Sequence, residues 1–184
     1  MIRRIVTTFS LIVLSSTVFA DPPSILESEP VTASSIRDWI LHLESMPCGR
    51  AYEACDPDWW QVVRLGLEHV PTILELVDDD TETEMLVCLF GGNFAVGDVA
   101  VISFMSIIQG VSVALMAAGG DQDAFDRIGF GTYWQFVRES QENRESMRRF
   151  LEEWFASNQS RLEWVRLHES PAGGYYRVKP DDPA

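Results

Sequence analysis

The sequence lacks the residue patterns that identify most enzymes and metal proteins. It contains only three histidines and three cysteines, and none of them shows a paired ligand spacing such as HxxxH or CxxC. It also has no G-x-S-x-G nucleophile motif and no GxxxxGK[ST] phosphate loop. The acidic run 78–84 departs from the EF-hand calcium loop, which needs glycine at its sixth position and glutamate at its twelfth, where this chain has Thr83 and Leu89. We therefore expect no metal ion and no cofactor, and we assign no residue a catalytic role.

Basic residues are also scarce. The chain has 14 lysines and arginines against 28 aspartates and glutamates, which gives a formal net charge of −14. Nucleic acids and anionic membrane surfaces repel so acidic a protein, so neither is an expected partner. A basic protein partner is compatible with this charge, although an acidic balance by itself indicates only solubility.

The N-terminus has the pattern of an export signal. Arg3 and Arg4 precede an apolar stretch that ends in the small-x-small sequence 18–20. We expect cleavage after Ala20 and a periplasmic or secreted protein with a net charge of −16, since two arginines leave with the signal. The alternative for this segment is an N-terminal membrane anchor. In an oxidising compartment Cys48 and Cys55 are expected to form a disulfide that closes a short loop.

One long stretch without charge, Val99–Gly119, determines the kind of protein. It is long enough to span a bilayer, which takes about 20 apolar residues, and equally long enough to be the centre of a helical core. Asp98 and Asp121 flank it where a membrane span favours lysine or arginine, and Gly110 divides it. We therefore expect the buried hub of a soluble domain and no membrane span after signal cleavage.

The fold class predicted is mainly α, an αα-hairpin helical domain around this buried central helix. Apolar residues at a spacing of 3–4, capping residues and prolines predict helices over 34–46, 57–69, 71–77, 94–109, 111–118 and 132–158. The expected organisation is a signal peptide over 1–20, an extended lead-in over 21–32, one domain over 33–178 and a loose tail over 179–184. Aromatic and β-branched residues around a glycine-proline turn predict a small β-hairpin over 162–178, and the competing interpretation continues the preceding helix through Leu167.

Part of the chain resembles a known type of helical repeat. The run Leu65-Gly66 followed by Val70-Pro71-Thr72-Ile73-Leu74-Glu75-Leu76-Val77-Asp78-Asp79 is similar to the HEAT repeat, and the stretch 96–110 is similar to the helix of a following repeat. The resemblance covers residues 59–110, and a long insertion interrupts the repeat period. It implies paired helices and no activity. The sequence Val-Gly-Asp-Val-Ala over 96–100 also resembles uncharacterised exported bacterial proteins.

Binding is the function that this sequence favours. The candidate binding residues are Asn93, Asp98, Tyr133, Trp134, Tyr175 and Tyr176. The aromatic members lie beside glycine-rich breaks, and aromatic residues are typical of interfaces. Asn93 follows the break at Gly91-Gly92 and is expected to cap the next helix. The same aromatic residues are also typical of core packing. Asp98 is expected in the first turn of a helix, where the helix dipole favours a carboxylate. The leading hypothesis is a non-catalytic binding or scaffolding protein with a protein partner. The alternatives are an acidic inhibitor or immunity-like protein against a basic envelope enzyme or toxin, and an enzyme of unknown class.

Overall fold

The computed structural model describes residues 30–45, 57–87 and 91–180. It separates the chain into a unit ending at Pro30 and a unit Val31–Ala184, and the helices and strands belong to the second unit. The expected signal peptide, most of the lead-in and the proposed Cys48–Cys55 disulfide lie outside the described residues.

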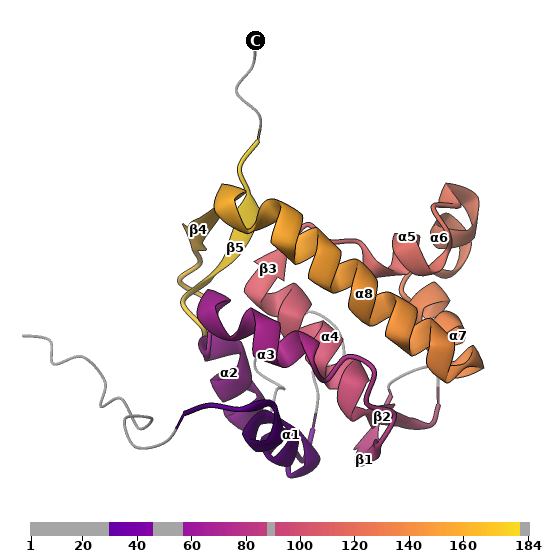
Figure 1. Ribbon diagram of the computed structural model, residues 1–184, viewed down its shortest axis with the longest axis horizontal. Helices are drawn as coiled ribbons and strands as arrows, with labels where there is room; N and C mark the ends of the chain where they lie inside the picture. The colour runs from indigo at the N-terminus through magenta and orange to yellow at the C-terminus, as the bar shows by residue number, and fades with distance from the viewer. Residues whose placement is uncertain (1–29, 46–56, 88–90, 181–184) are drawn as a thin grey trace, which may run out of the picture. The chain divides into compact units, whose positions relative to one another are not determined.

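The described part of the second unit is mainly α-helical with two small sheets, as Figure 1 shows. Its α-helices are α1 (Ala33–Leu41), α2 (Pro57–Arg64), α3 (Val70–Leu74), α4 (Val96–Ile107), α5 (Val113–Ala117), α6 (Gln122–Ile128), α7 (Gly131–Glu139) and α8 (Gln141–Asn158). The strands are β1 (Glu82–Leu86), β2 (Asn93–Ala95), β3 (Ile108–Gln109), β4 (Leu162–Arg166) and β5 (Gly174–Val178). Two 3-10 turns, η2 (Leu67–His69) and η3 (Gln159–Arg161), precede α3 and β4.

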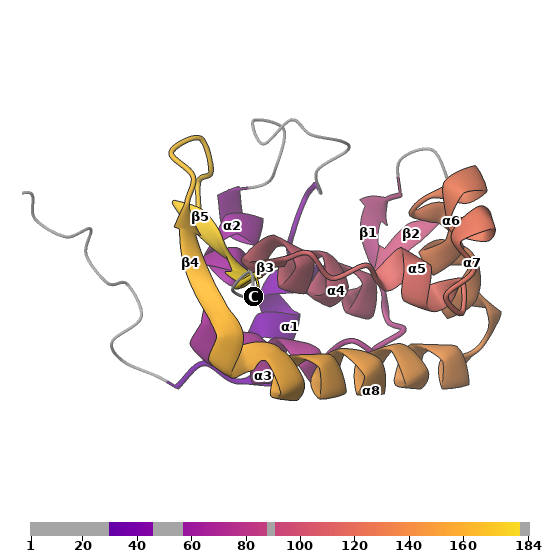
Figure 2. The same ribbon diagram turned by 90° about the horizontal axis from the view of Figure 1, so that it is seen from above.

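The uncharged stretch provides the core, as predicted. Helix α4 is buried over most of its length, and Val99, Ala100 and Phe104 have no exposed surface. Helices α1, α2 and α3 pack on α4, and α3 in turn contacts α8, which runs alongside it in Figures 1 and 2. The expected break before Val111 is present. Helix α4 ends at Ile107, Ile108 and Gln109 are extended and form β3, and Gly110 follows with a φ of 95°. No helix of the described segments is long and apolar enough to cross a membrane.

Gly97 explains how closely α4 approaches the chain before β1. Its backbone N–H donates a 2.9 Å hydrogen bond to the carbonyl of Asp79. A Cβ atom at Gly97 would overlap the carbonyl oxygen of Val77. The first turn of α4 can therefore lie directly on the turn that follows α3, and this contact fixes where β1 begins.

Several predicted helix boundaries are wrong. Thr32 caps α1 in place of Ser34 or Ser35, and the helix ends at Leu41. The predicted helix over 57–69 ends at Arg64, because Gly66 adopts a φ of 70°. Asn93 does not cap α4 but belongs to strand β2, which pairs antiparallel with β1.

The predicted helix over 132–158 is two helices. Ser140 has extended backbone angles, φ −161° and ψ 158°, which separate α7 from α8. Its hydroxyl oxygen accepts a hydrogen bond from the backbone N–H of Asn143 at 3.2 Å, so Ser140 is the N-cap of α8. A serine inside an amphipathic pattern does not reveal such a break, because the apolar spacing continues across it.

The C-terminal hairpin is present. Strands β4 and β5 pair antiparallel, with Trp164 opposite Tyr176 and Arg166 opposite Gly174. Strand β3 pairs parallel with the other edge of β5, which attaches the hairpin to the end of α4. The alternative of a helix continuing through Leu167 is wrong.

Candidate functional site

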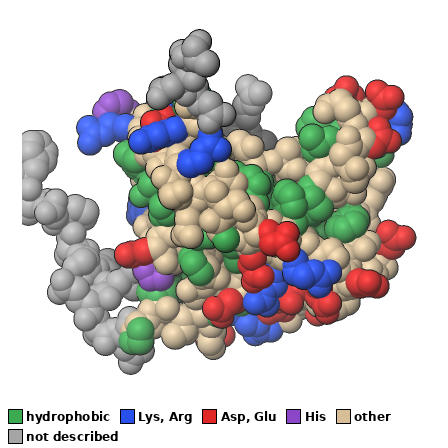
Figure 3. Space-filling model, turned by 45° about the horizontal axis from the view of Figure 1, so that its top comes forward, with side chains coloured by type: hydrophobic (Ala, Val, Ile, Leu, Met, Phe, Trp, Pro, Cys, Tyr) green, Lys and Arg blue, Asp and Glu red, His purple; other side chains and the backbone are tan. Residues whose placement is uncertain are grey.

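A cavity of about 250 Å³ lies where the β1–β2 sheet meets α7 and α8. Its wall is unusually rich in charged groups of both signs. The lining residues are Asp80, Glu82, Gly92, Asn93, Ala95, Arg138 and Arg144. Figure 3 shows acidic and basic side chains intermixed on the face that it displays.

Behind the cavity wall lies a buried network centred on Asp98. Its Oδ1 accepts a hydrogen bond from Arg144 Nη1 at 3.0 Å and another from the Tyr133 hydroxyl at 3.0 Å. Its Oδ2 accepts from the backbone N–H of Ala95 at 2.8 Å, just before α4. The Asp98 side chain is 1% exposed and that of Arg144 is 8% exposed. A buried carboxylate is tolerated only when it is paired and hydrogen-bonded, and this one meets both conditions.

The network also perturbs Tyr133. Complete burial raises the pKa of the Tyr133 hydroxyl well above its ordinary value, and the negative charge of Asp98 raises it further. The hydroxyl therefore keeps its proton and acts as a donor to Asp98 over the whole physiological range. This role fixes Tyr133 as a structural support and removes it as an acid or base.

Arg144 connects the network to the cavity. A guanidinium has five N–H donors in a rigid fork. Within the described residues Asp98 is its only hydrogen-bond partner, although the Arg144 side chain also lines the cavity. A buried arginine with donors left over, facing an open volume, is suited to bind an acceptor from outside the chain.

Arg138 forms a second positive group at the cavity, held by backbone and aromatic contacts. Its Nη1 donates to the carbonyl of Gly91 at 3.0 Å, and its Nη2 lies 3.4 Å from the carbonyl of Asn93. Its Cζ lies 5.3 Å from the ring centroid of Trp134, within the range of a cation–π contact. None of these partners is anionic, so the charge of Arg138 is not neutralised by the part of the chain that the structure describes.

Two carboxylates also belong to the lining. Asp80 and Glu82 are exposed, and neither forms an ion pair or hydrogen bond through its side chain with any described residue. They lie at the beginning of β1, which the Asp79 turn positions. The Asp79 side chain, in contrast, has partners within the chain. Its carboxylate accepts hydrogen bonds from Arg37 Nε at 2.6 Å and from the backbone N–H of Thr81 at 2.9 Å.

The structure brings four of the six predicted binding residues to this region. Asn93 lines the cavity, and Asp98, Tyr133 and Trp134 form the layer beneath it. Tyr133 is fully buried and Trp134 is 4% exposed, so they support the cavity and do not form an exposed aromatic patch.

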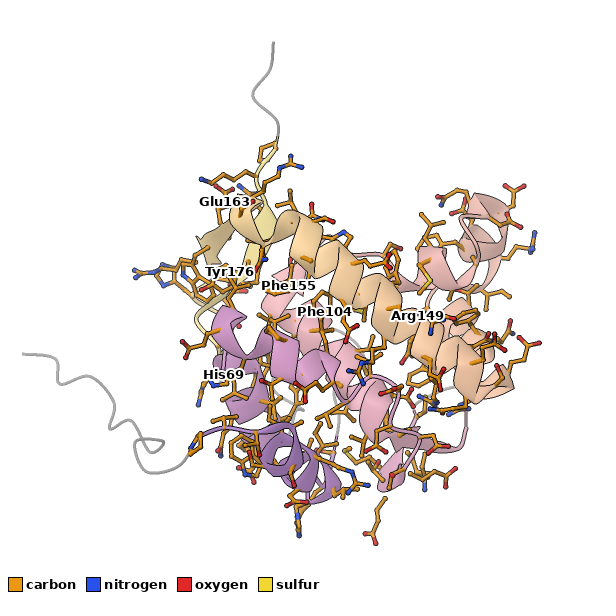
Figure 4. All side chains as sticks on the ribbon, viewed as in Figure 1. His69, Phe104, Arg149, Phe155, Glu163 and Tyr176 are labelled. Carbon is orange, nitrogen blue, oxygen red and sulfur yellow. The ribbon has the colours of Figure 1, made fainter. Side chains whose placement is uncertain are left out.

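Tyr175 and Tyr176 belong to a different place. Both are half-buried in β5 of the hairpin, where the ring of Tyr176 meets Trp164 edge-on at 5.0 Å. Figure 4 shows Tyr176 and Glu163 at the hairpin and Arg149 further along α8. Tyr175 contributes to a separate cavity of about 80 Å³, which is too small for anything larger than a few waters.

Sequence reasoning missed Arg138, Arg144, Asp80 and Glu82. A signal for Arg144 exists, because the buried residues of α8 are Arg144, Met147, Leu151 and Phe155, at helical spacing. An arginine on the apolar stripe of a helix predicts a buried ion pair. The other three residues stand on exposed positions and carry no local signal.

A scan against protein-family models and searches of curated proteins and of solved structures found no match. The chemistry of the cavity therefore depends on its own geometry. It has no group of three or more histidine, cysteine, aspartate or glutamate side chains able to hold a metal, as far as the structure describes the chain. It presents fixed charges of both signs, which is an arrangement for binding.

Proposed function

We propose that this chain is an exported protein that acts by binding a protein partner, and that the charged cavity is the centre of its binding surface. The supporting observation is the set of charged side chains at the cavity that form no ion pair within the described residues: Arg138, Asp80 and Glu82. Folded proteins usually pair such groups or leave them dispersed in solvent. Charged side chains gathered at one concave place are available to a ligand.

A HEAT-like arrangement of the helices is part of this proposal. It is supported by the way α2 and α3, joined through η2, both pack on α4. We propose that these helices form the scaffold of the binding surface. Residues 59–110 resemble the HEAT repeat, and proteins built from such repeats commonly bind partners on an extended surface.

Export and charge favour a basic partner. With the signal removed, the chain carries a net charge of −16, and an acidic surface accelerates association with a basic protein. Asp80 and Glu82 offer a place for a lysine or arginine of that partner. An inhibitor or immunity-like protein that blocks a basic envelope enzyme or toxin would have these properties, and this is the second candidate function.

The test is a capture experiment with the chain from Asp21 immobilised and envelope extract as the source. A cavity variant carries Asp80→Asn, Glu82→Gln and Arg138→Gln. Its matched control changes two acids and one arginine elsewhere on the exposed surface: Glu153→Gln, Glu169→Gln and Arg166→Gln. We expect a partner that binds the wild type and the control but binds the cavity variant at least about tenfold more weakly, since each lost charged hydrogen bond contributes about 1.5–3 kcal/mol.

The dependence of association on salt tests the second candidate function. An inhibitor of a basic partner should associate markedly more slowly as ionic strength rises, because exposed charges are screened beyond roughly 10 Å at 0.1 M salt. Equal capture by the wild type and the cavity variant would exclude the cavity as the binding surface. Turnover of a substrate that the cavity variant abolishes would replace binding by catalysis.

A further inference from the structure

We propose that the cavity between the β1–β2 sheet and helices α7 and α8 binds the α-carboxylate and the side-chain cation of a single basic amino-acid residue. A free basic amino acid and a lysine or arginine at the C-terminus of a peptide both present this pair. The inference rests on the proposed binding function and specifies what the cavity receives.

The arginines form the carboxylate half of the site. The charge of Arg144 is balanced by Asp98, which accepts from Nη1 alone among its donors, and Arg144 is one of the residues that line the cavity. Arg138 adds an unbalanced positive charge, held over Trp134 and against two backbone carbonyls. Together they offer N–H donors to an anion and one net positive charge, which matches a single carboxylate.

Gly92 and the carbonyl contacts keep Arg138 in place. Gly92 has a φ of 73°, in the left-handed region that favours glycine. A Cβ atom there would lie 3.3 Å from Nη2 of Arg138, so a larger residue would crowd the guanidinium. The glycine therefore allows the arginine to lie close to the β2 backbone while its outer face stays at the cavity.

The acids form the cationic half. Asp80 and Glu82 line the same volume and have no partner among the described residues. Two carboxylates near one another repel, and a cationic nitrogen between them removes that repulsion. The same two charges repel a phosphate or another multiply charged anion, which the arginines alone would accept.

Size limits the ligand further. The volume of about 250 Å³ corresponds to the space of about eight liquid waters and lies below the range of about 300–1,000 Å³ typical of drug-sized ligands. It accommodates one amino-acid residue, with the rest of a peptide leaving through the open side. The protein thus recognises a chain end or a free amino acid, and not an internal segment.

Binding is measured by calorimetry on the chain from Asp21 with four probes. These are free lysine, N-acetyl-glycyl-glycyl-lysine, the same peptide as its C-terminal amide, and the same peptide ending in norleucine. We expect the lysine peptide with its free carboxylate to bind with a dissociation constant below about 1 mM. The amide and the norleucine peptide each lose one half of the recognised pair and should bind at least about tenfold more weakly. If free lysine binds tightly, the ligand is an amino acid. If the lysine peptide with its free carboxylate binds and free lysine does not, the ligand is the C-terminal residue of a peptide.

Variants test which side chains recognise the carboxylate of the ligand and which recognise its cation. Arg138→Gln should abolish the preference for the free carboxylate over the amide, and Asp80→Asn with Glu82→Gln should abolish the preference for lysine over norleucine. Arg149→Gln changes an exposed arginine of α8 whose Nη2 donates to Ser146, and should leave all affinities unchanged. These positions are exposed, so the variants should keep the wild-type circular dichroism and melting temperature.

Absence of binding by all four probes, or equal binding of all peptides, would overturn this inference. The proposed protein partner is tested separately by capture. A partner that depends on the cavity but is not displaced by the lysine peptide would retain the proposed function and exclude the carboxylate–cation ligand.

Discussion

The cavity and the C-terminal hairpin both combine arginine with aromatic residues, and they use them in opposite ways. At the cavity the aromatic rings of Tyr133 and Trp134 are buried, and the charged groups Arg138 and Arg144 lie above them. In the hairpin the rings are nearer the surface. Trp164 is 48% exposed, and Arg177 forms an exposed ion pair with Glu163 at 2.9 Å.

This difference shows that similar composition does not imply similar burial or charge pairing. The Trp164 ring covers Gly174 of the opposite strand, where a Cβ atom would lie 2.6 Å from the ring. The hairpin rings therefore pack on their own sheet, and Arg177 beside them is paired with Glu163. At the cavity the rings are covered, and Arg138 forms no ion pair with a described residue.

The largest loss of stability is expected when the buried ion pair between Arg144 and Asp98 is broken. Arg144→Met should lower the free energy of unfolding by about 3–5 kcal/mol, because Asp98 would stay buried without a counter-charge. Tyr133→Phe removes one neutral donor from the same carboxylate and should cost about 1.5–3 kcal/mol. Urea unfolding followed by tryptophan fluorescence measures both. An Arg144→Met protein as stable as the wild type would show that the network does not hold α8 against α4.

An intermediate effect is expected at Asp79, which pairs with Arg37 at the partly exposed turn before β1. Partial burial raises the pKa of this carboxyl, but hydrogen bonds from Thr81 and then Arg37 outweigh it, so the pKa lies below 3.8. A lowered pKa in the folded state means that the unfolded chain binds more protons, so this stabilisation is complete above the unfolded pKa and is lost as pH falls through the folded pKa.

Asp79→Asn should therefore cost about 1 kcal/mol at neutral pH, a modest value because the pair is partly exposed to solvent. The variant should also lose less stability than the wild type between about pH 5 and about pH 3. Urea midpoints over this range give the comparison, with Asp126→Asn on exposed α6 as the control. Parallel pH curves for the wild type and Asp79→Asn would contradict the role of Asp79.

The smallest effect is expected in the hairpin. Trp164→Ala removes the edge-on contact with Tyr176 and should lower stability by about 0.5–1.5 kcal/mol, the range for an aromatic pair. Ligand affinity at the cavity should not change, because the two regions share no residue. Thermal unfolding and the calorimetric titration test both statements, and a loss of cavity binding in Trp164→Ala would mean that the two regions are coupled.

Most of the helical framework was predictable from the sequence because apolar periodicity, glycines and prolines act locally. The uncharged stretch around Val99 had to be covered, and Gly110 predicted a break between two helices. The hairpin followed from aromatic and β-branched residues around a glycine-rich turn. The break at Ser140 was not predictable, because serine is tolerated within a helix as well as at its N-cap.

The cavity could be predicted only in part, since its members come from four segments of the chain. Asn93 and Asp98 were identified as candidates from their place beside a glycine break and a helix start. That Asp98 bonds Arg144 and Tyr133 depends on the packing of α4 against α7 and α8, which no local pattern contains.

By itself, the sequence determined a mainly helical chain with a strongly negative net charge and a buried central helix, and it favoured a short C-terminal hairpin over a continued helix. These properties depend on hydrophobic burial and on backbone preferences, and residues close together in the sequence set both. Only the tertiary structure decided which charges are paired and which remain at the cavity. Charge pairing depends on distances between segments far apart in the sequence, and a difference of a few ångströms separates an ion pair from a group available to a ligand.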